Sequence, residues 1–298
     1  MSVAFIFPGQ GGQFVGQGQA WVQKDPSLME VFKMADDISG RPISKLCFEG
    51  PAEDLSKTIN LQPAVLAVSL AALRLMKAAS GKPSFTAGHS LGEFGALCAA
   101  EVIDENTAMA LVTKRAALMD ANAAKIPGAM MAVIGMPAEE LEPICELARN
   151  EGVVIMANFN TPEQIVISGE ARAVTAAGKY IKMKNGRAIA LPVSGGFHSQ
   201  LMAEAAEGFA AELEKVEFQN PVCPVVPNGT GILTSDPAEI KKQLLTQITS
   251  PVLWTKTVES LLEAGATSFV EAWPKAYLGS MVKKCLPKGS EIPVTFQQ

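Results

Sequence analysis

The sequence predicts an α/β fold in which a parallel sheet is covered by helices on both faces and a smaller unit is inserted. Two observations support this prediction. Short apolar segments of strand length alternate with helical patterns in the N-terminal part, which is the order of a parallel sheet. After Ile126-Pro127-Gly128 the order changes, and two strand patterns soon follow each other directly. A chain of 298 residues is long enough for one large domain with such an insertion.

The N-terminal part is expected to contain two strands. The apolar run 3–7 ends at Pro8-Gly9 and predicts a buried strand followed by a loop. A second short strand is expected at 84–87. Helical patterns cover residues 18–23, 26–39 and 62–79 before this second strand and residues 93–100 and 105–124 after it.

The inserted unit shows the order βαββαβ, which is that of a ferredoxin-like fold. We therefore expect a small subdomain at 127–192 and a large subdomain made of 1–126 and 193–298. In the small subdomain the patterns predict strands at 129–134, 153–157, 164–168 and 187–191, with helices at 138–150 and 171–183. After it they predict a helix at 198–216, a strand at 222–226, two helices, a strand at 268–271 and a helix at 276–285.

Charge and composition argue against several classes of function. The net charge of −5 and the low isoelectric point do not favour nucleic acid as a partner. The five cysteines include no Cys-x-x-Cys pair, as expected for reduced thiols in a cytoplasmic protein. The first residues predict no signal peptide, and the apolar stretch 63–73 is too short to cross a membrane. Because the two histidines are far apart and lack partners at ligand spacing, we expect no metal.

The most informative motif is Gly88-His89-Ser90-Leu91-Gly92, which lies between a predicted strand and a predicted helix. In this context Gly-x-Ser-x-Gly is typical of a nucleophile elbow, a tight turn that presents the serine hydroxyl at the start of a helix. Helix N–H groups and the helix dipole then point toward negative charge that forms there. The alternative is an ordinary turn in which Ser90 only caps the helix.

A catalytic serine needs a base within hydrogen-bonding distance, and the sequence offers two histidines. His89 precedes Ser90 and is expected to point away from it, in a packing role behind the elbow. His198 lies in the glycine-bearing run Ser194-Gly195-Gly196-Phe197-His198, where the insertion ends and a helix is predicted to begin. We therefore favour His198 as the base, while a histidine at a helix start can also be purely structural.

Two further positions can complete a catalytic site. The loop Phe7-Pro8-Gly9-Gln10-Gly11 is glycine-rich, so its backbone can approach a ligand, and the Gln10 N–H can serve with the Leu91 N–H as an oxyanion hole. A plain turn remains an alternative. A phosphate loop is a further alternative, but the segment lacks the Lys-Ser/Thr that ends such a loop. Arg115 lies in a helical run among alanines and leucines. It is either solvated at the surface or directed into the pocket, where a guanidinium can bind a carboxylate.

Four motifs together resemble the malonyl-CoA:acyl carrier protein transacylases, the acyltransferase family of fatty acid and polyketide synthesis. They are Phe-Pro-Gly-Gln-Gly at 7–11, Gly-His-Ser-Leu-Gly-Glu-Phe at 88–94, Arg115, and Gly-Phe-His-Ser at 196–199. The resemblance runs from Val3 to about Lys284. It implies an α/β hydrolase-like large subdomain that carries a ferredoxin-like small one.

The resemblance also implies a role for each matching residue. Ser90 would be the acylated nucleophile and His198 its base, with Gln10 and Leu91 as the oxyanion hole and Arg115 on the malonyl carboxylate. The family has no acidic third member of the triad, and a backbone carbonyl before Ser-Pro-Val-x-Trp orients the histidine; here Gln247 matches it. Phe197 resembles the malonyl-selecting members, because a bulky ring beside the pocket leaves little room for an α-methyl group.

The resemblance implies transfer of malonyl from malonyl-CoA to the phosphopantetheine thiol of acyl carrier protein by a ping-pong mechanism. No cofactor beyond these substrates is implied, and we expect a monomer. The alternatives are an acyl hydrolase or thioesterase on the same fold, a trans-acting polyketide synthase acyltransferase, and an inactive carrier-binding scaffold. The basic run Lys179, Lys182, Lys184 and Arg187 could attract an acidic carrier protein or could be an ordinary solvated helix face.

The sequence departs from the family pattern at two places. Gly12 replaces the usual serine after Gly-Gln-Gly. The usual Glu-x-Gly-Pro-Gly-Lys-x-Leu is Glu271-Ala272-Trp273-Pro274-Lys275-Ala276-Tyr277-Leu278, in which two glycines and the lysine are changed. These changes leave open whether the 271–278 segment contacts CoA or the carrier.

Overall fold

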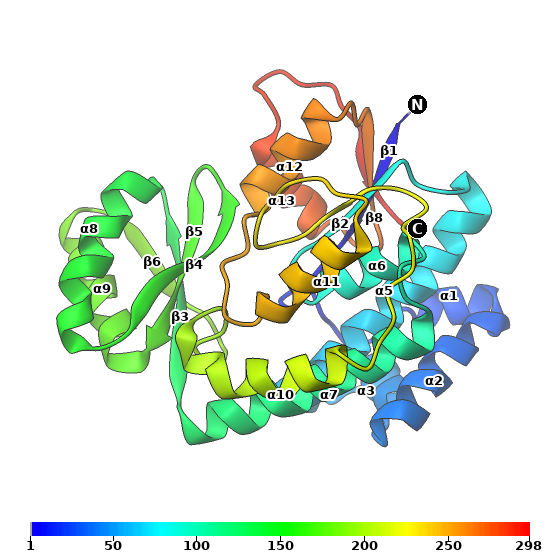
Figure 1. Cartoon of the computed structure of the whole chain (residues 1–298), viewed down its shortest axis with the longest axis horizontal. Helices are drawn as coiled ribbons and strands as arrows, with labels where there is room; N and C mark the ends of the chain where they lie inside the picture. The colour runs from blue at the N-terminus through cyan, green and yellow to red at the C-terminus, as the bar shows by residue number, and fades with distance from the viewer. Residues whose placement is uncertain (1) are drawn as a thin grey trace.

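The computed structural model describes residues 2–298, apart from the side chain of Ser80 (Figure 1). Its larger part is built on a five-stranded sheet of order β7-β2-β1-β8-β9, in which every neighbouring pair is parallel. The strands are β1 (Val3–Phe7), β2 (Phe85–Gly88), β7 (Val225–Val226), β8 (Ser268–Glu271) and β9 (Val294–Phe296). The α/β class predicted from the sequence is confirmed. The edge strand β9 was not predicted, because three residues after a proline carry too little periodicity.

Helices surround this sheet, and the longest of them lie in the apolar core of the larger part. They are α1 (Gln19–Lys24), α2 (Met29–Ser39), α3 (Ile43–Glu49), α4 (Ala52–Leu55), α5 (Thr58–Ser80), α6 (Gly92–Ala99), α7 (Glu105–Lys125), α10 (Ala203–Leu213), α11 (Pro237–Thr246), α12 (Trp254–Glu263) and α13 (Leu278–Cys285). By length and composition, residues 58–79 of α5 could cross a membrane. However, 83% of the most apolar window of α5 is buried inside the fold, as in a core helix.

The smaller part has an antiparallel sheet of its own, of order β4-β5-β3-β6. Two helices pack on this sheet, and together they enclose a separate apolar core (green, on the left of Figure 1). In chain order the elements are β3 (Gly128–Ile134), α8 (Ala138–Ala148), β4 (Val154–Thr161), β5 (Gln164–Glu170), α9 (Ala171–Met183) and β6 (Arg187–Ala190). This order is βαββαβ. The subdomain limits at 127–192 stay a prediction.

The two parts are joined by backbone hydrogen bonds as well as by the two connecting segments of the chain. A bridge pairs Asn158 of β4 with Val252, just before α12. The Phe159 N–H donates to the Val252 carbonyl, and the Val252 N–H donates to the Ala157 carbonyl, both at 2.8 Å. This bridge anchors the segment before α12 against the small sheet, close to the cleft between the two parts.

The register of the large sheet sets the position of the site. β1 and β2 are parallel neighbours in which Phe7 is opposite Gly88, so the loops that follow the two strands lie side by side. The helix predicted at 198–216 is wrong at its start. His198 has φ of 60°, which a right-handed helix does not allow, and a 3₁₀ turn begins only at Gln200 before α10.

Candidate active site

Ser90 lies in a sharp turn between β2 and α6. Its φ is 51°, a left-handed conformation that is uncommon outside glycine. Both flanking glycines are required by close approach: a Cβ at Gly88 would lie 2.0 Å from the Gly92 carbonyl carbon, and a Cβ at Gly92 would lie 2.0 Å from the Phe7 carbonyl oxygen. The alternative in which Ser90 caps the helix is wrong, since Leu91 occupies the cap position and the Ser90 hydroxyl points elsewhere.

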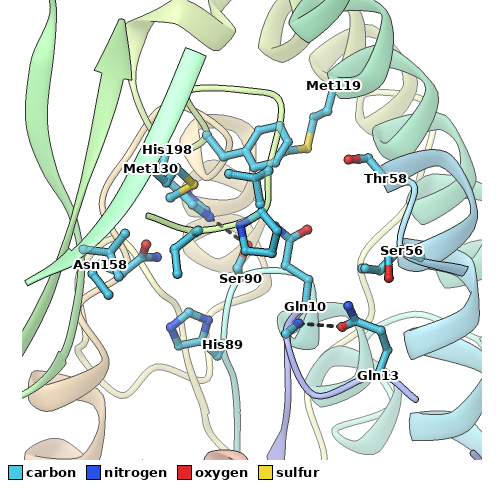
Figure 2. Close-up of a pocket in the computed structure, with 18 of the residues that line it drawn as sticks. Gln10, Gln13, Ser56, Thr58, His89, Ser90, Met119, Met130, Asn158 and His198 are labelled. Carbon is cyan, nitrogen blue, oxygen red and sulfur yellow. Dashed lines mark hydrogen bonds between the residues drawn. The ribbon is translucent and has the colours of Figure 1, made fainter. Parts of the chain in front are cut away.

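The Ser90 hydroxyl meets His198, and Figure 2 shows the two side chains facing each other across the cleft. Ser90 Oγ is 2.8 Å from His198 Nε2. His198 Nδ1 lies 3.0 Å from two backbone carbonyls, those of Gln247 and Ser250. Because carbonyls only accept, Nδ1 carries the proton, and Nε2 is then free to accept the Ser90 proton. This is the arrangement that a serine nucleophile and its base require.

The environment of His198 keeps its imidazole neutral. Burial, together with the positive charge of Arg115 and the nearby His89, lowers the pKa of His198 to about 3. His89 itself is not bonded to Ser90: its Nε2 is 2.8 Å from Asn160 Oδ1, and its ring lies 5.8 Å from that of Trp254. Its ring nevertheless lines the cleft.

The lowered pKa of His198 predicts the pH dependence of acylation. A neutral imidazole that acts as the base, with a pKa below the ordinary 6.5, should keep the rate level as the pH falls through 6.5. The acid limb should appear only well below that value. Single-turnover acylation between about pH 4 and about pH 8, with circular dichroism to verify folding at each pH, measures this. A half-maximal rate near pH 6.5 would contradict it.

Arg115 of α7 points into the cleft rather than to solvent, which resolves the choice left open by the sequence. It is only 1% exposed. Its Nη1 donates to Gln62 Oε1 at 2.8 Å, and its Nη2 reaches Ser90 Oγ at 3.2 Å. Among residues 2–298, no carboxylate lies within 4.0 Å of its guanidinium. Burial lowers the pKa of Arg115 to about 10, so the group remains charged at neutral pH.

Gln247 connects the other parts of the site, a role that the sequence did not reveal. Besides the carbonyl that faces His198, its side chain makes three contacts. Its Oε1 accepts from Arg115 Nη2 at 3.1 Å, while its Nε2 donates to the Ser90 carbonyl and to Glu93 Oε2, both at 2.9 Å. One residue therefore holds the base, the cation and the elbow in fixed relative positions.

Asn228 and Glu93 belong to the hydrogen-bond network that holds the elbow. Asn228 Oδ1 accepts from the Ser90 N–H at 2.5 Å, and its Nδ2 donates to the Gly88 carbonyl at 2.6 Å. Burial raises the pKa of Glu93 to about 7. Glu93 could have been noticed as the single acid in an apolar helical run, whereas nothing in the sequence around Asn228 marks it.

The two predicted oxyanion donors lie beside the elbow. The loop after β1 packs on it so closely that a Cβ at Gly9 would be 2.5 Å from the His89 carbonyl oxygen. Within the described part of the chain, neither the Gln10 N–H nor the Leu91 N–H donates a hydrogen bond. Both donors are therefore available for a ligand oxygen. The phosphate-loop alternative is not supported, because a tyrosine ring covers the glycines that follow Gln10.

One cavity of about 630 Å³ lies between the two parts of the molecule and is lined by Ser90, His198 and Arg115 among others (Figure 2). The large part contributes Gln10, Ser90 and Arg115 to its wall, and the small part contributes residues of β3, β4 and β5. Phe197 also lines the cavity next to His198 and is 2% exposed. Its carbonyl accepts from the Ser168 hydroxyl at 2.6 Å, which restrains the backbone of Phe197.

Fold and site together define an acyltransferase. Residues 4–295 match the acyl transferase domain family, and the chain belongs to this family.

Individual relatives agree with this assignment. The chain is 41% identical to a malonyl CoA-acyl carrier protein transacylase of Bacillus subtilis, over 95% of this chain and 90% of that one. It is 39% identical to the protein of that name in Escherichia coli K12, over 94% of this chain and 92% of that one. The acyl-carrier-protein S-malonyltransferase of Bartonella henselae superposes with a TM-score of 0.94 at 37% identity, covering 100% of this chain and 95% of that one. A malonyl transacylase in complex with a type II polyketide acyl carrier protein superposes with a TM-score of 0.93 at 37% identity, covering 99% of this chain and 95% of that one.

Proposed function

We propose that this acyltransferase moves the malonyl group from malonyl-CoA to the phosphopantetheine thiol of an acyl carrier protein. The observation that carries the proposal is the buried guanidinium of Arg115, which contacts the Ser90 hydroxyl and has no carboxylate partner in the described structure. A buried charge is costly unless it is paired. An acyl group that brings its own carboxylate removes this cost, and malonyl does so within reach of the nucleophile. The relatives named above are consistent with this substrate.

The first half of the reaction forms a malonyl ester on Ser90. His198 Nε2 takes the hydroxyl proton while Oγ attacks the thioester carbonyl. The carbonyl oxygen becomes negative and is stabilised by the N–H groups of Gln10 and Leu91. When the carbon–sulfur bond breaks, the proton on Nε2 passes to the departing sulfur, and CoA leaves as a thiol.

The second half repeats these steps with a different thiol. The carrier's pantetheine sulfhydryl gives its proton to His198 and attacks the ester carbonyl, and the same two N–H groups stabilise the oxyanion. Ser90 Oγ then leaves and recovers the proton. No oxidant, reductant or cofactor is needed, since each half exchanges one carbon–sulfur bond for one carbon–oxygen bond or the reverse.

Arg115 contributes to both binding and basicity. A guanidinium can hold a carboxylate by two parallel hydrogen bonds, which fixes the acyl group for attack. The same carboxylate offsets the positive charge that contributes to the lowered pKa of His198. Bound malonyl therefore makes His198 a stronger base than a neutral acyl group would. Phe197 restricts the space beside the acyl chain, as proposed for selection against an α-methyl group.

Intact-mass spectrometry after incubation with a mixture of malonyl-, methylmalonyl- and acetyl-CoA tests the proposal. We expect a stable adduct of one malonyl group on Ser90 and its discharge when carrier protein is added. Continuous hydrolysis without an accumulating adduct would instead indicate a thioesterase. A stable adduct that only a polyketide carrier discharges would indicate the trans-acting alternative, and no labelling by a serine-directed phosphonate would indicate a scaffold.

The carrier is expected to approach over the basic run at the end of α9, in the turn after it and at the start of β6. Lys179, Lys182, Lys184 and Arg187 are all exposed, and none is within 4.0 Å of a carboxylate among the residues described. Reversal of Lys182 and Lys184 to Glu should slow transfer to the acidic carrier about 10-fold by loss of electrostatic attraction, while leaving acylation by malonyl-CoA unchanged. The double reversal of Lys33 and Lys45, exposed on the distant α2 and α3, is the matched control. Equal slowing of both half-reactions would contradict docking at this site. The monomeric state and the cytoplasmic location stay predictions.

A further inference from the structure

Two segments that are distant in the sequence lie against each other at the edge of the cavity. The Tyr277 hydroxyl donates to the Gln10 carbonyl at 3.1 Å, and Trp273 Nε1 donates to the Gly12 carbonyl at 3.3 Å. Lys275 Nζ lies 3.4 Å from the centroid of the Phe14 ring. The segment 273–277 thus holds the loop 10–14 at three points, two of them on its backbone.

The contact is tight enough to determine which residues the loop can contain. A Cβ at Gly12 would lie 2.8 Å from Tyr277 Cγ, closer than side chains approach each other. Gly12 does not have a left-handed φ, so the backbone alone does not require glycine there. The Tyr277 ring does require it. Gly12 and Trp273 are both departures from the family pattern, and the structure shows that they contact each other; Tyr277 lies in the same 271–278 segment.

Tyr277 is itself firmly anchored. The buried Glu271, at the end of β8, accepts hydrogen bonds from the backbone N–H groups of Tyr277, Leu278 and Gly279 at 3.0, 2.7 and 2.9 Å. Glu271 is fully buried, and Trp273 is 0% exposed. A rigid connection therefore runs from the central sheet through Tyr277 to the carbonyl of Gln10.

We propose that Tyr277 is a positioning residue for the oxyanion hole. By holding the Gln10 carbonyl, its hydroxyl restrains the backbone of the residue whose N–H is directed at the developing negative charge. The effect reaches the reaction only through Gln10, and it rests on the proposed function, in which that N–H stabilises the tetrahedral intermediate. The ring also fills the space beside Gly12, so the loop cannot shift toward it.

The Tyr277→Phe variant tests the hydroxyl alone, because the ring stays in place. We expect the single-turnover acylation rate at saturating acyl-CoA to fall about 3- to 10-fold, the effect of one neutral hydrogen bond. The fall should be the same for malonyl-CoA and acetyl-CoA, because both form the same oxyanion, and half-saturating concentrations should not change. Tyr180→Phe is the matched control, since Tyr180 is the other tyrosine and lies on α9 with no hydrogen bond from its hydroxyl in the described structure.

Each outcome separates this inference from the function it rests on. If the parent protein acylates normally and Tyr277→Phe matches it, the positioning role is wrong. If Tyr277→Phe slows only malonyl-CoA, the hydroxyl contacts the substrate carboxylate and the inference is also wrong. If the parent protein itself forms no malonyl adduct, the proposed function fails independently of Tyr277.

A double-mutant cycle tests the packing part without relying on the hydroxyl. Gly12→Ala should slow acylation strongly in the parent protein, where the new methyl group meets the Tyr277 ring. In a Tyr277→Ala background the same substitution should have a much smaller effect, since the space is then open. Equal effects of Gly12→Ala in both backgrounds would show that the two residues act independently and would overturn the inference.

Discussion

A Ser90→Ala variant is expected to form no covalent adduct with malonyl-CoA and to lose transfer activity by about 10⁶-fold, the loss seen when a catalytic serine is removed from a serine protease. The reason is that no other group in the cleft can hold the acyl chain between the two thiols. His198 and Arg115 remain in place, but neither can form the ester. Alanine accepts the left-handed turn about as poorly as serine does, so the variant should keep the stability of the parent.

Mass spectrometry of the intact protein and a thermal melt measure the two parts of this prediction. The control is Ser56→Ala, because Ser56 is an exposed serine on the wall of the same cavity (Figure 2). Ser56→Ala should be acylated like the parent. A malonyl adduct that persists in Ser90→Ala would place the nucleophile elsewhere, and peptide mapping would find it.

An Arg115→Ala variant should lose malonyl uptake about 10²- to 10⁴-fold and should accept acetyl-CoA better than the parent. Two hydrogen bonds between charged groups contribute about 1.5 to 3 kcal/mol each, which sets the size of the loss. Neutral acyl groups should bind better, because they no longer leave an unpaired cation buried beside them. Part of the loss comes from Gln62 and Gln247, whose side-chain oxygens both lose the guanidinium as a donor.

Two further variants separate charge from geometry at this position. Arg115→Lys keeps the charge but not the planar fork, so its malonyl uptake should lie between that of Arg115→Ala and the parent. Lys114→Ala removes an adjacent cation that is exposed and close to Glu212, and should have no effect. Acylation rates with malonyl-CoA and acetyl-CoA give the ratio for each variant. An unchanged ratio in Arg115→Ala would rule out the carboxylate contact.

The sequence revealed those parts of the site whose residues lie close together in short, contiguous motifs. The strand, glycine and helix signals around Ser90 occur within about a dozen residues, and each has a steric cause that the structure displays. The βαββαβ order of the inserted unit was visible for the same reason, since it depends on local periodicity. Arg115 remained ambiguous because a helical pattern shows which residues share a face but not what that face meets.

The parts that the sequence did not reveal depend on contacts between distant segments. Gln62, Asn228 and the side chain of Gln247 are ordinary amides in sequence, and only the tertiary fold brings them to Ser90 and Arg115. The departures at Gly12 and Trp273 could be seen in the sequence, but their 261-residue separation hid the fact that they touch. Short helices such as α3 and the edge strand β9 were missed because few residues carry their pattern.

The replacement of an acidic triad member by two backbone carbonyls has a consequence for how fast the proton returns in both half-reactions. An imidazolium at position 198 faces only neutral oxygens, so it holds its proton weakly and gives it up to whichever sulfur is leaving. Exchange of one thioester for another is nearly balanced in free energy. A weakly held proton speeds both directions alike, and net flow is set by the relative concentrations of the two thioesters and the two free thiols.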